Sequence, residues 1–143
     1  MLGAPLFWGG KTTRVRRLAA ETGQLVQEGR ILVADDDAVF RETVAELLRF
    51  EGYKVESAAN GVEAVDAVVR WQPSLVLLDL YMPLLDGWGF ARELEAAGVH
   101  VPIVVMTGEQ DAWSVAAGIR AKDWLEKPFR MRDLLPAVAR ACA

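Results

Sequence analysis

The sequence has few of the residues and patterns that mark secreted, membrane-spanning or nucleic-acid-binding proteins. Of its 143 residues only Cys142 is a cysteine, so no disulfide can form within the chain. A single thiol is compatible with a reducing cytosol, and we expect a cytoplasmic protein. No apolar run approaches the roughly 20 residues that a membrane-spanning helix needs, so no membrane insertion is expected. The basic residues near the N-terminus follow a short apolar patch, which is the wrong order for a secretory signal.

Positive charge is not in excess either. The formal net charge is −4 and the isoelectric point is near 5.0, so direct binding to nucleic acid is not expected. Hydrophobic residues make up 52% of the chain and charged residues 25%, which is typical of a compact globular protein and not of a disordered one. The length is that of one domain with a sizeable core.

The first 29 residues differ in character from the rest. Gly9, Gly10 and Gly29 punctuate this stretch, and apolar residues between them recur at helical spacing. Gly23 interrupts that pattern. We predict that residues 1–29 are an N-terminal extension, either flexible or a short amphipathic helix, and that residues 30–143 form the domain.

From Arg30 onward, short apolar runs alternate five times with segments of helical periodicity. Strands are predicted at Ile31–Ala34, Tyr53–Val55, Leu75–Asp79, Val101–Met106 and Trp124–Leu125. Helices are predicted at about Val39–Phe50, from an Asn60 cap to Trp71, at Gly87–Ala97, at about Gln110–Ala117 and at about Met131–Arg140. Asp37 is expected to cap the first helix. Pro136 would be tolerated in the last helix only if that helix began near Asp133. The alternation predicts a doubly wound α/β fold, a five-stranded parallel sheet with helices on both faces.

The run from Leu75 to Asp79 is the centre of this pattern. Four apolar residues lead directly into a carboxylate, and Pro73 and Pro83 bound the element. A continuous apolar run of this length predicts a strand buried on both faces, with Asp79 at its carboxyl end. In open α/β sheets that edge is where ligands bind. The simpler alternative is that Asp79 only caps the following turn.

Other chemically active residues also follow predicted strands. Asp35 and Asp36 follow the first strand, Thr107 the fourth and Lys127 the fifth. Right-handed crossovers bring the carboxyl ends of all strands to one edge, so these residues should meet Asp79 there. Neighbouring carboxylates favour a Mg²⁺ ion between them. A carboxylate can attack phosphorus to give an aspartyl phosphate, and an ammonium and a hydroxyl would stabilise the transferred group.

With these motifs in place, the chain from Arg30 onward resembles the response-regulator receiver domain of two-component signalling, a CheY-like fold. The resemblance is carried by ILVADDD after the first strand, LLDLYMPLLDG around Asp79, VVMTG at Thr107 and EKPF at Lys127. It implies the strand order 2-1-3-4-5 and a phosphoprotein of a phosphorelay, not an enzyme.

The resemblance also implies roles for individual residues. Asp79 is the phosphoacceptor, and Mg²⁺ is held by Asp36, by Asp79 and by the backbone carbonyl of Tyr81. Asp35 lies close behind as a further acid of the metal site. Lys127 holds the phosphoryl group.

Signal transmission is implied for two further residues. Thr107 moves toward the phosphoryl group, and Trp124 occupies the aromatic switch position. Tyr81 and Glu109 are expected to shape water access and hence hydrolysis of the aspartyl phosphate, which the receiver itself assists. The segment between Thr107 and Lys127 is shorter than is usual in the family, and Arg120-Ala121 replaces a common Gly-Ala, so the fourth helix should be reshaped.

The expected partners are a sensor histidine kinase or a phosphotransfer protein and a downstream protein target, with a homodimer as a further option. The chain is expected to work as a stand-alone receiver. Two alternatives stay open. One is a receiver-like module that binds partners without being phosphorylated. The other is a haloacid-dehalogenase-type phosphatase that uses Asp35, since Asp35 to Val39 fits its D-x-D-x-V motif.

Overall fold

The computed structural model describes residues 29–108 and 112–142. Most of the predicted N-terminal extension, residues 1–28, and the predicted water-access residue Glu109 lie outside the described residues. The elements are β1 (Arg30–Ala34), α2 (Ala38–Phe50), β2 (Lys54–Ala58), α3 (Gly61–Trp71), β3 (Leu75–Asp79), α4 (Gly87–Ala96), β4 (Ile103–Thr107), α5 (Ala112–Ile119), β5 (Asp123–Glu126) and α6 (Met131–Cys142). Among the described helices, none combines the length and apolar character needed to cross a bilayer.

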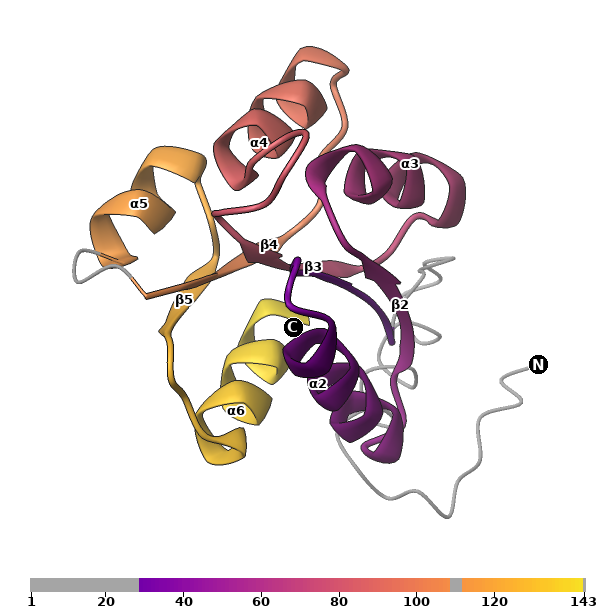
Figure 1. The fold of residues 1–143 in the computed structure, drawn as a ribbon, viewed down its shortest axis with the longest axis vertical. Helices are drawn as coiled ribbons and strands as arrows, with labels where there is room; N and C mark the ends of the chain where they lie inside the picture. Colours follow the sequence, from indigo (N-terminus) through magenta and orange to yellow (C-terminus); the bar gives the residue numbers. More distant parts are fainter. Residues whose placement is uncertain (1–28, 109–111, 143) are drawn as a thin grey trace, which may run out of the picture.

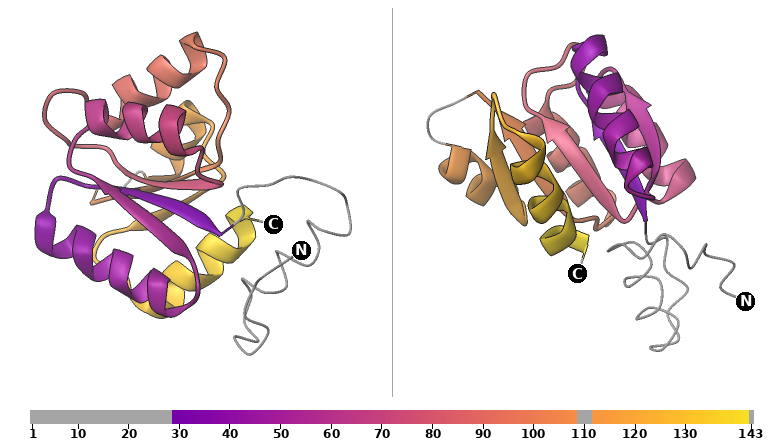
Figure 2. Two further views of the ribbon diagram at one scale, coloured as in Figure 1. Left: turned by 90° about the vertical axis from the view of Figure 1, so that its right-hand side faces the viewer. Right: turned by 90° about the horizontal axis from the view of Figure 1, so that it is seen from below.

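The strands form one parallel sheet in the order β2-β1-β3-β4-β5, which confirms the predicted topology. Helices α3, α4 and α5 cover one face of the sheet, and α2 and α6 cover the other (Figure 1; Figure 2). Each face has its own cluster of buried apolar side chains. Every residue of β3 and β4 is buried, as expected for strands enclosed between two helical layers. The carboxyl ends of the strands therefore share one edge.

Side-chain caps fix where three helices begin. Asp37 accepts a hydrogen bond from the Phe40 N–H (3.1 Å) and Asn60 accepts one from the Glu63 N–H (2.8 Å), so both predicted caps are confirmed. Asp86 caps α4 in the same way. Each cap satisfies a backbone donor that the first turn of a helix leaves free.

Pro136 does not shift the start of the last helix, α6. It begins at Met131, and Pro136 lies inside its second turn. The start is fixed because the Asp133 carboxylate accepts a hydrogen bond from the Arg130 N–H (3.1 Å), as in half of a capping box. The predicted start at about Met131 is confirmed, and the expectation that Pro136 requires a start near Asp133 is wrong, because the fold tolerates the loss of the hydrogen bond that proline cannot donate. Smaller shifts occur at β2, which runs on to Ala58, and at α5, which ends at Ile119.

Three helices end in the same hydrogen-bonding pattern. At the ends of α2, α4 and α5, the N–H of Gly52, Gly98 or Arg120 donates to the carbonyl three residues back, and the N–H of the following residue donates to the carbonyl five residues back. This is the Schellman motif, whose left-handed position favours glycine. Gly52 (φ 106°) and Gly98 (φ 71°) occupy that position after α2 and α4, but Arg120 (φ 63°) occupies it after α5. Arg120, which stands where the family commonly has glycine, therefore adopts a left-handed backbone conformation that favours glycine.

We expect the Arg120→Gly variant to be more stable than the wild type by about 1 kcal/mol. A left-handed backbone costs a residue with a Cβ about 1–2 kcal/mol, part of which glycine loses again through its greater unfolded-state entropy. Urea unfolding would measure the change. Arg120→Ala is the control, because it removes the same charge and keeps the strain. Equal stability of the Gly and Ala variants would show that the backbone conformation is not the cause.

Candidate functional site

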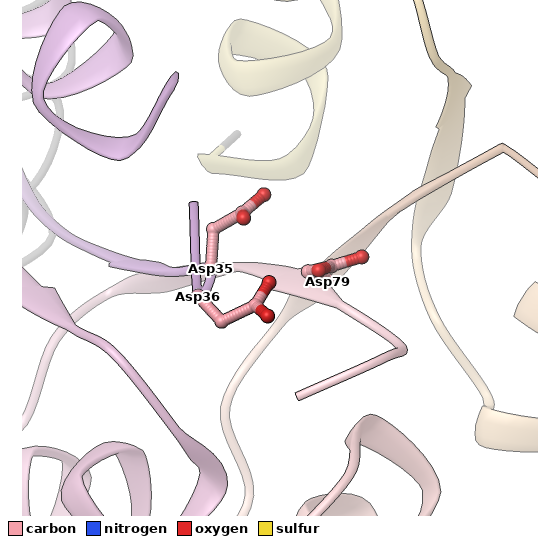
Figure 3. A group of neighbouring side chains, drawn as sticks. All are labelled: Asp35, Asp36 and Asp79. Carbon is pink, nitrogen blue, oxygen red and sulfur yellow. The ribbon is translucent and has the colours of Figure 1, made fainter. Parts of the chain in front are cut away.

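Three carboxylates meet at the carboxyl edge of the sheet (Figure 3). Ala34 of β1 pairs with Leu78 of β3, so the next residue of each strand, Asp35 and Asp79, lie beside each other. Asp36 follows in the loop. One oxygen from each of the three side chains lies within 4.8 Å of the others. The structure thus brings together the acids that the sequence predicted at this edge.

Asp35 is the most enclosed of the three, with no exposed surface. One oxygen of its carboxylate lies 2.7 Å from Lys127 Nζ, and the other accepts a hydrogen bond from the Asp37 N–H (2.9 Å). Arg41 Nη1 donates to the Asp35 backbone carbonyl (2.8 Å). Both carboxylate oxygens are therefore engaged, which leaves Asp35 poorly placed to act as a nucleophile.

Lys127 reaches the acids from the end of β5. Its backbone N–H donates to the Thr107 carbonyl (2.7 Å), which fixes the residue beside β4. Its ammonium lies 3.7 Å from Asp79 Oδ1 as well as 2.7 Å from Asp35. The single ammonium thus faces two carboxylates, and Asp36 adds a third negative charge. This surplus of charge on hard oxygen donors fits a divalent cation such as Mg²⁺.

The pKa of Asp79 reflects this excess of negative charge. The pKa of Asp79 is raised from 3.8 to about 6, most of all by burial and next by the negative charge of the Asp35 carboxylate. The Lys127 ammonium and a backbone hydrogen bond from Tyr81 lower the pKa, and Asp36 raises it slightly. Relative to the unfolded chain, the metal-free fold therefore disfavours the ionised form of Asp79.

A pH-dependent stability difference follows from this shift. Since the folded-state pKa lies above the unfolded value, Asp79 contributes stability that is fully present below about pH 4 and is lost as pH rises through about 6. In EDTA we expect Asp79→Asn to be more stable than the wild type by on the order of 2–3 kcal/mol at about pH 7. The difference should vanish toward pH 4, as measured by urea unfolding at both pH values. A difference that is independent of pH would contradict the assignment.

The other predicted residues occupy distinct places. Thr107, at the end of β4, is fully buried beside the acids, since Asp79 pairs with the preceding Met106. Tyr81 lies in the loop after β3 with a 54% exposed side chain, and its ring contacts Trp88 edge-on at 5.5 Å between centroids. Trp124 lies within β5 and is 42% exposed. It pairs with Val105, two residues before Thr107 at the end of β4. Its switch role stays a prediction.

The sequence did not point to Phe40 as a site residue. Its helical spacing indicated only a place on the apolar face of the first helix. In the structure, Lys127 Nζ lies 4.4 Å from the centre of the Phe40 ring, and Phe129 packs edge-on against that ring at 5.6 Å. An aromatic face attracts an ammonium, so the two rings help to hold Lys127 over the acids. In the sequence, the only signal for Phe40 was that it follows shortly after the Asp35–Asp36 motif.

If Asp79 accepts a phosphoryl group, as the resemblance implies, we expect Phe40→Leu to slow that transfer by about threefold to tenfold, the kinetic equivalent of one partly exposed cation–π contact. The rate would be followed by intact mass after addition of acetyl phosphate and Mg²⁺. Phe40→Tyr keeps the ring and should match the wild type. Phe50→Leu is a second control, because Phe50 is 84% exposed at the far end of α2. A Phe40→Leu rate equal to that of the wild type would rule out the positioning role.

Comparisons with known proteins agree with this geometry. The model of the response regulator receiver domain matches residues 31–139. The response regulator MprA of Mycobacterium sp. (strain KMS) is 44% identical over 108 residues, which are 74% of this chain and 47% of that protein. MprA of Mycobacterium leprae (strain TN) is 41% identical over 111 residues, covering 76% and 49% of the two chains. The chain spans about half the length of the curated relatives it matches.

Solved structures show the same fold. The receiver domain of NtrX from Brucella abortus is 32% identical with a TM-score of 0.71, over 78% of this chain and 97% of that one. The receiver domain of sensor histidine kinase PA1611 from Pseudomonas aeruginosa PAO1 is 31% identical with a TM-score of 0.71, over 79% and 96%. That structure has a magnesium ion coordinated in its active site cleft.

Proposed function

Because the chain belongs to the response regulator receiver domain family, we propose that it is a phosphoacceptor in two-component signalling and that Asp79 is the residue phosphorylated. The main support is the acidic cluster at the end of β1 and β3, with one ammonium beside it. Asp79 is favoured over Asp35 because both Asp35 oxygens are already engaged. This preference also weighs against the dehalogenase-type alternative.

The reaction proposed is the transfer of one phosphoryl group. An oxygen of the Asp79 carboxylate attacks phosphorus, and a new O–P bond forms as the bond from phosphorus to the leaving group breaks. The leaving group departs with the bonding electron pair and is the imidazole of a phosphohistidine or the acetate of acetyl phosphate. The donor is a histidine kinase or a phosphotransfer protein. Hydrolysis of the acyl phosphate returns the protein to its first state.

Mg²⁺ is part of the proposal. Asp36, Asp79 and the backbone carbonyl of Tyr81 would hold it, with Asp35 close behind. When bound, the cation neutralises the carboxylates and balances the charge of the incoming phosphoryl group. The chain's own contributions are the nucleophile, the Lys127 ammonium that faces the transferred oxygens, and the Thr107 hydroxyl beside them.

The output of the domain is proposed to be a change in protein contacts. Phosphorylation would shift an existing equilibrium between two surface conformations, with Thr107 and Trp124 as the relay. We place the receiver domain at residues 30–143 and propose that it acts in the cytoplasm. The expectation that the receiver works alone stays a prediction, as does a homodimer.

The test is intact-mass measurement after incubation with acetyl phosphate and Mg²⁺. We expect the mass of one phosphoryl group to be added with Mg²⁺ and none in EDTA. The added group should be released by hydroxylamine, which cleaves acyl phosphates and leaves phosphoserine intact. A protein that gains no mass but still binds its partners would support the alternative of a phosphorylation-independent module.

A further inference from the structure

Helices α4 and α5 lie on the same face of the sheet (Figure 1). Residues of both helices line a groove between them. Its volume is about 600 Å³, which is within the roughly 300–1,000 Å³ of small-molecule sites. The segment from Val99 to Pro102, which joins α4 to β4, continues the lining and bounds one end. A groove of this size can hold a small molecule.

The floor of the groove is apolar. It is formed by the buried Leu94 and Ile103 and by the partly buried Trp88, Val101 and Ile119. Such a surface favours the apolar or aromatic body of a ligand, since each Å² removed from water contributes about 25 cal/mol.

The rim of the groove is basic. Arg92, Arg120 and Lys122 are all exposed there, although the whole chain has a net charge of −4. Among the described residues that line the groove, Glu95 is the only acid, and its carboxylate lies 3.9 Å from Arg120 Nη1. That pair is exposed on both sides and therefore weak, so an anion could replace Glu95 at Arg120 at little cost.

A glycine in α5 supplies an independent indication. Gly118 lines the groove, and a Cβ atom built on it would have no neighbour within 4 Å among the described residues. Gly61 and Gly87 differ, because a Cβ there would collide with the backbone of Leu85 or Asp79. A helical glycine costs about 1 kcal/mol relative to alanine, and packing in the described part of the chain gives no reason for this one. Glycine is expected where a ligand approaches the backbone closely.

We propose that this groove binds a small organic anion with an aromatic or other apolar body and one or two acidic groups. The body would lie on the floor against Trp88, and the acidic groups would face Arg92 and Lys122. This site is separate from the phosphorylation site and does not depend on the proposed function.

The probe is 1-anilinonaphthalene-8-sulfonate, an aromatic sulfonate, titrated into the full chain and followed by its fluorescence and by amide chemical shifts. We expect saturable binding with shifts at Gly118 and the surrounding groove. The uncharged analogue N-phenyl-1-naphthylamine should bind at least about tenfold more weakly, and the Arg92→Glu/Lys122→Glu variant should weaken the sulfonate by a similar factor. Arg132→Glu/Lys54→Glu reverses two exposed charges on α6 and β2, away from the groove, so it is the matched charge control and should bind like the wild type.

A second pair of variants tests the shape. Gly118→Phe should fill the groove and abolish binding. Gly118→Ala should weaken binding, because its methyl group would occupy the space in which the ligand approaches the backbone, and it should unfold at a higher temperature. Sulfonate binding that survives both Gly118→Phe and the double charge reversal would overturn the proposal, as would shifts centred elsewhere. An acidic peptide that occupies the groove when neither dye does would overturn it in favour of a protein partner.

The groove also touches the loop of the phosphorylation site. Trp88 lines the groove and contacts the Tyr81 ring, two residues beyond Asp79. Resting on the proposed function, we expect beryllofluoride with Mg²⁺ to change the dissociation constant of the sulfonate by about fivefold or more. The change should be lost in Tyr81→Ala. An unchanged constant in a protein that does become phosphorylated would overturn the coupling and leave the binding site standing.

Discussion

Replacing Asp79 with Asn should abolish the uptake of a phosphoryl group from acetyl phosphate. An amide oxygen is a far weaker nucleophile than a carboxylate, and Asn fills nearly the same volume, so the fold should be retained. We expect the phosphorylation rate to fall by more than about 10²-fold, to the limit of detection by intact mass. Asp66→Asn is the matched control, because Asp66 is exposed on α3, away from the acidic cluster.

The result matters most for the neighbouring acids. Asp35 and Asp36 keep their carboxylates in the Asp79→Asn variant, so loss of uptake would identify Asp79 and not the cluster as a whole. Continued uptake, with the phosphoryl group located on Asp36 by peptide mapping, would show that a neighbouring acid is the acceptor. Uptake on Asp35 would revive the phosphatase-like alternative.

The second large effect is expected from Lys127→Met. The ammonium lies 3.7 Å from the Asp79 carboxylate, where the oxygens of the transferred group would gather charge. Removing one positioned donor of this kind typically slows such a reaction by about 10²-fold. Intact-mass kinetics with acetyl phosphate would measure it. Lys54→Met is the control, since Lys54 is exposed at the start of β2.

The Lys127 variant also changes stability, which calls for a second variant. Without the ammonium, the buried Asp35 carboxylate loses its partner at 2.7 Å, which we expect to cost about 3 kcal/mol. Lys127→Met/Asp35→Asn removes that unpaired charge and should recover most of the stability without recovering the rate. A double variant that is phosphorylated at the wild-type rate would exclude a catalytic role for Lys127.

Local patterns were sufficient for much of the fold. Continuous apolar runs between turn residues marked β1, β3 and β4, because strands buried on both faces need no alternation. Asp37 and Asn60 were identifiable as caps because capping depends on neighbouring backbone atoms only. Local reasoning also predicted the start of α6 at about Met131, but it gave too much weight to Pro136, because the Arg130–Asp133 hydrogen bond and the packing of α6 outweigh the hydrogen bond that proline cannot donate.

The sequence by itself determined the order of the elements and which acids, hydroxyl and ammonium end the strands, because periodicity and chain direction are written in neighbouring residues. The tertiary structure decided which of these groups touch. In the folded chain, the Lys127 ammonium lies beside Asp35 and Asp79, and the Phe40 ring contacts that ammonium. A groove with a basic rim lies between α4 and α5. Contacts between residues far apart in the chain depend on how the layers pack, and no local pattern encodes that packing.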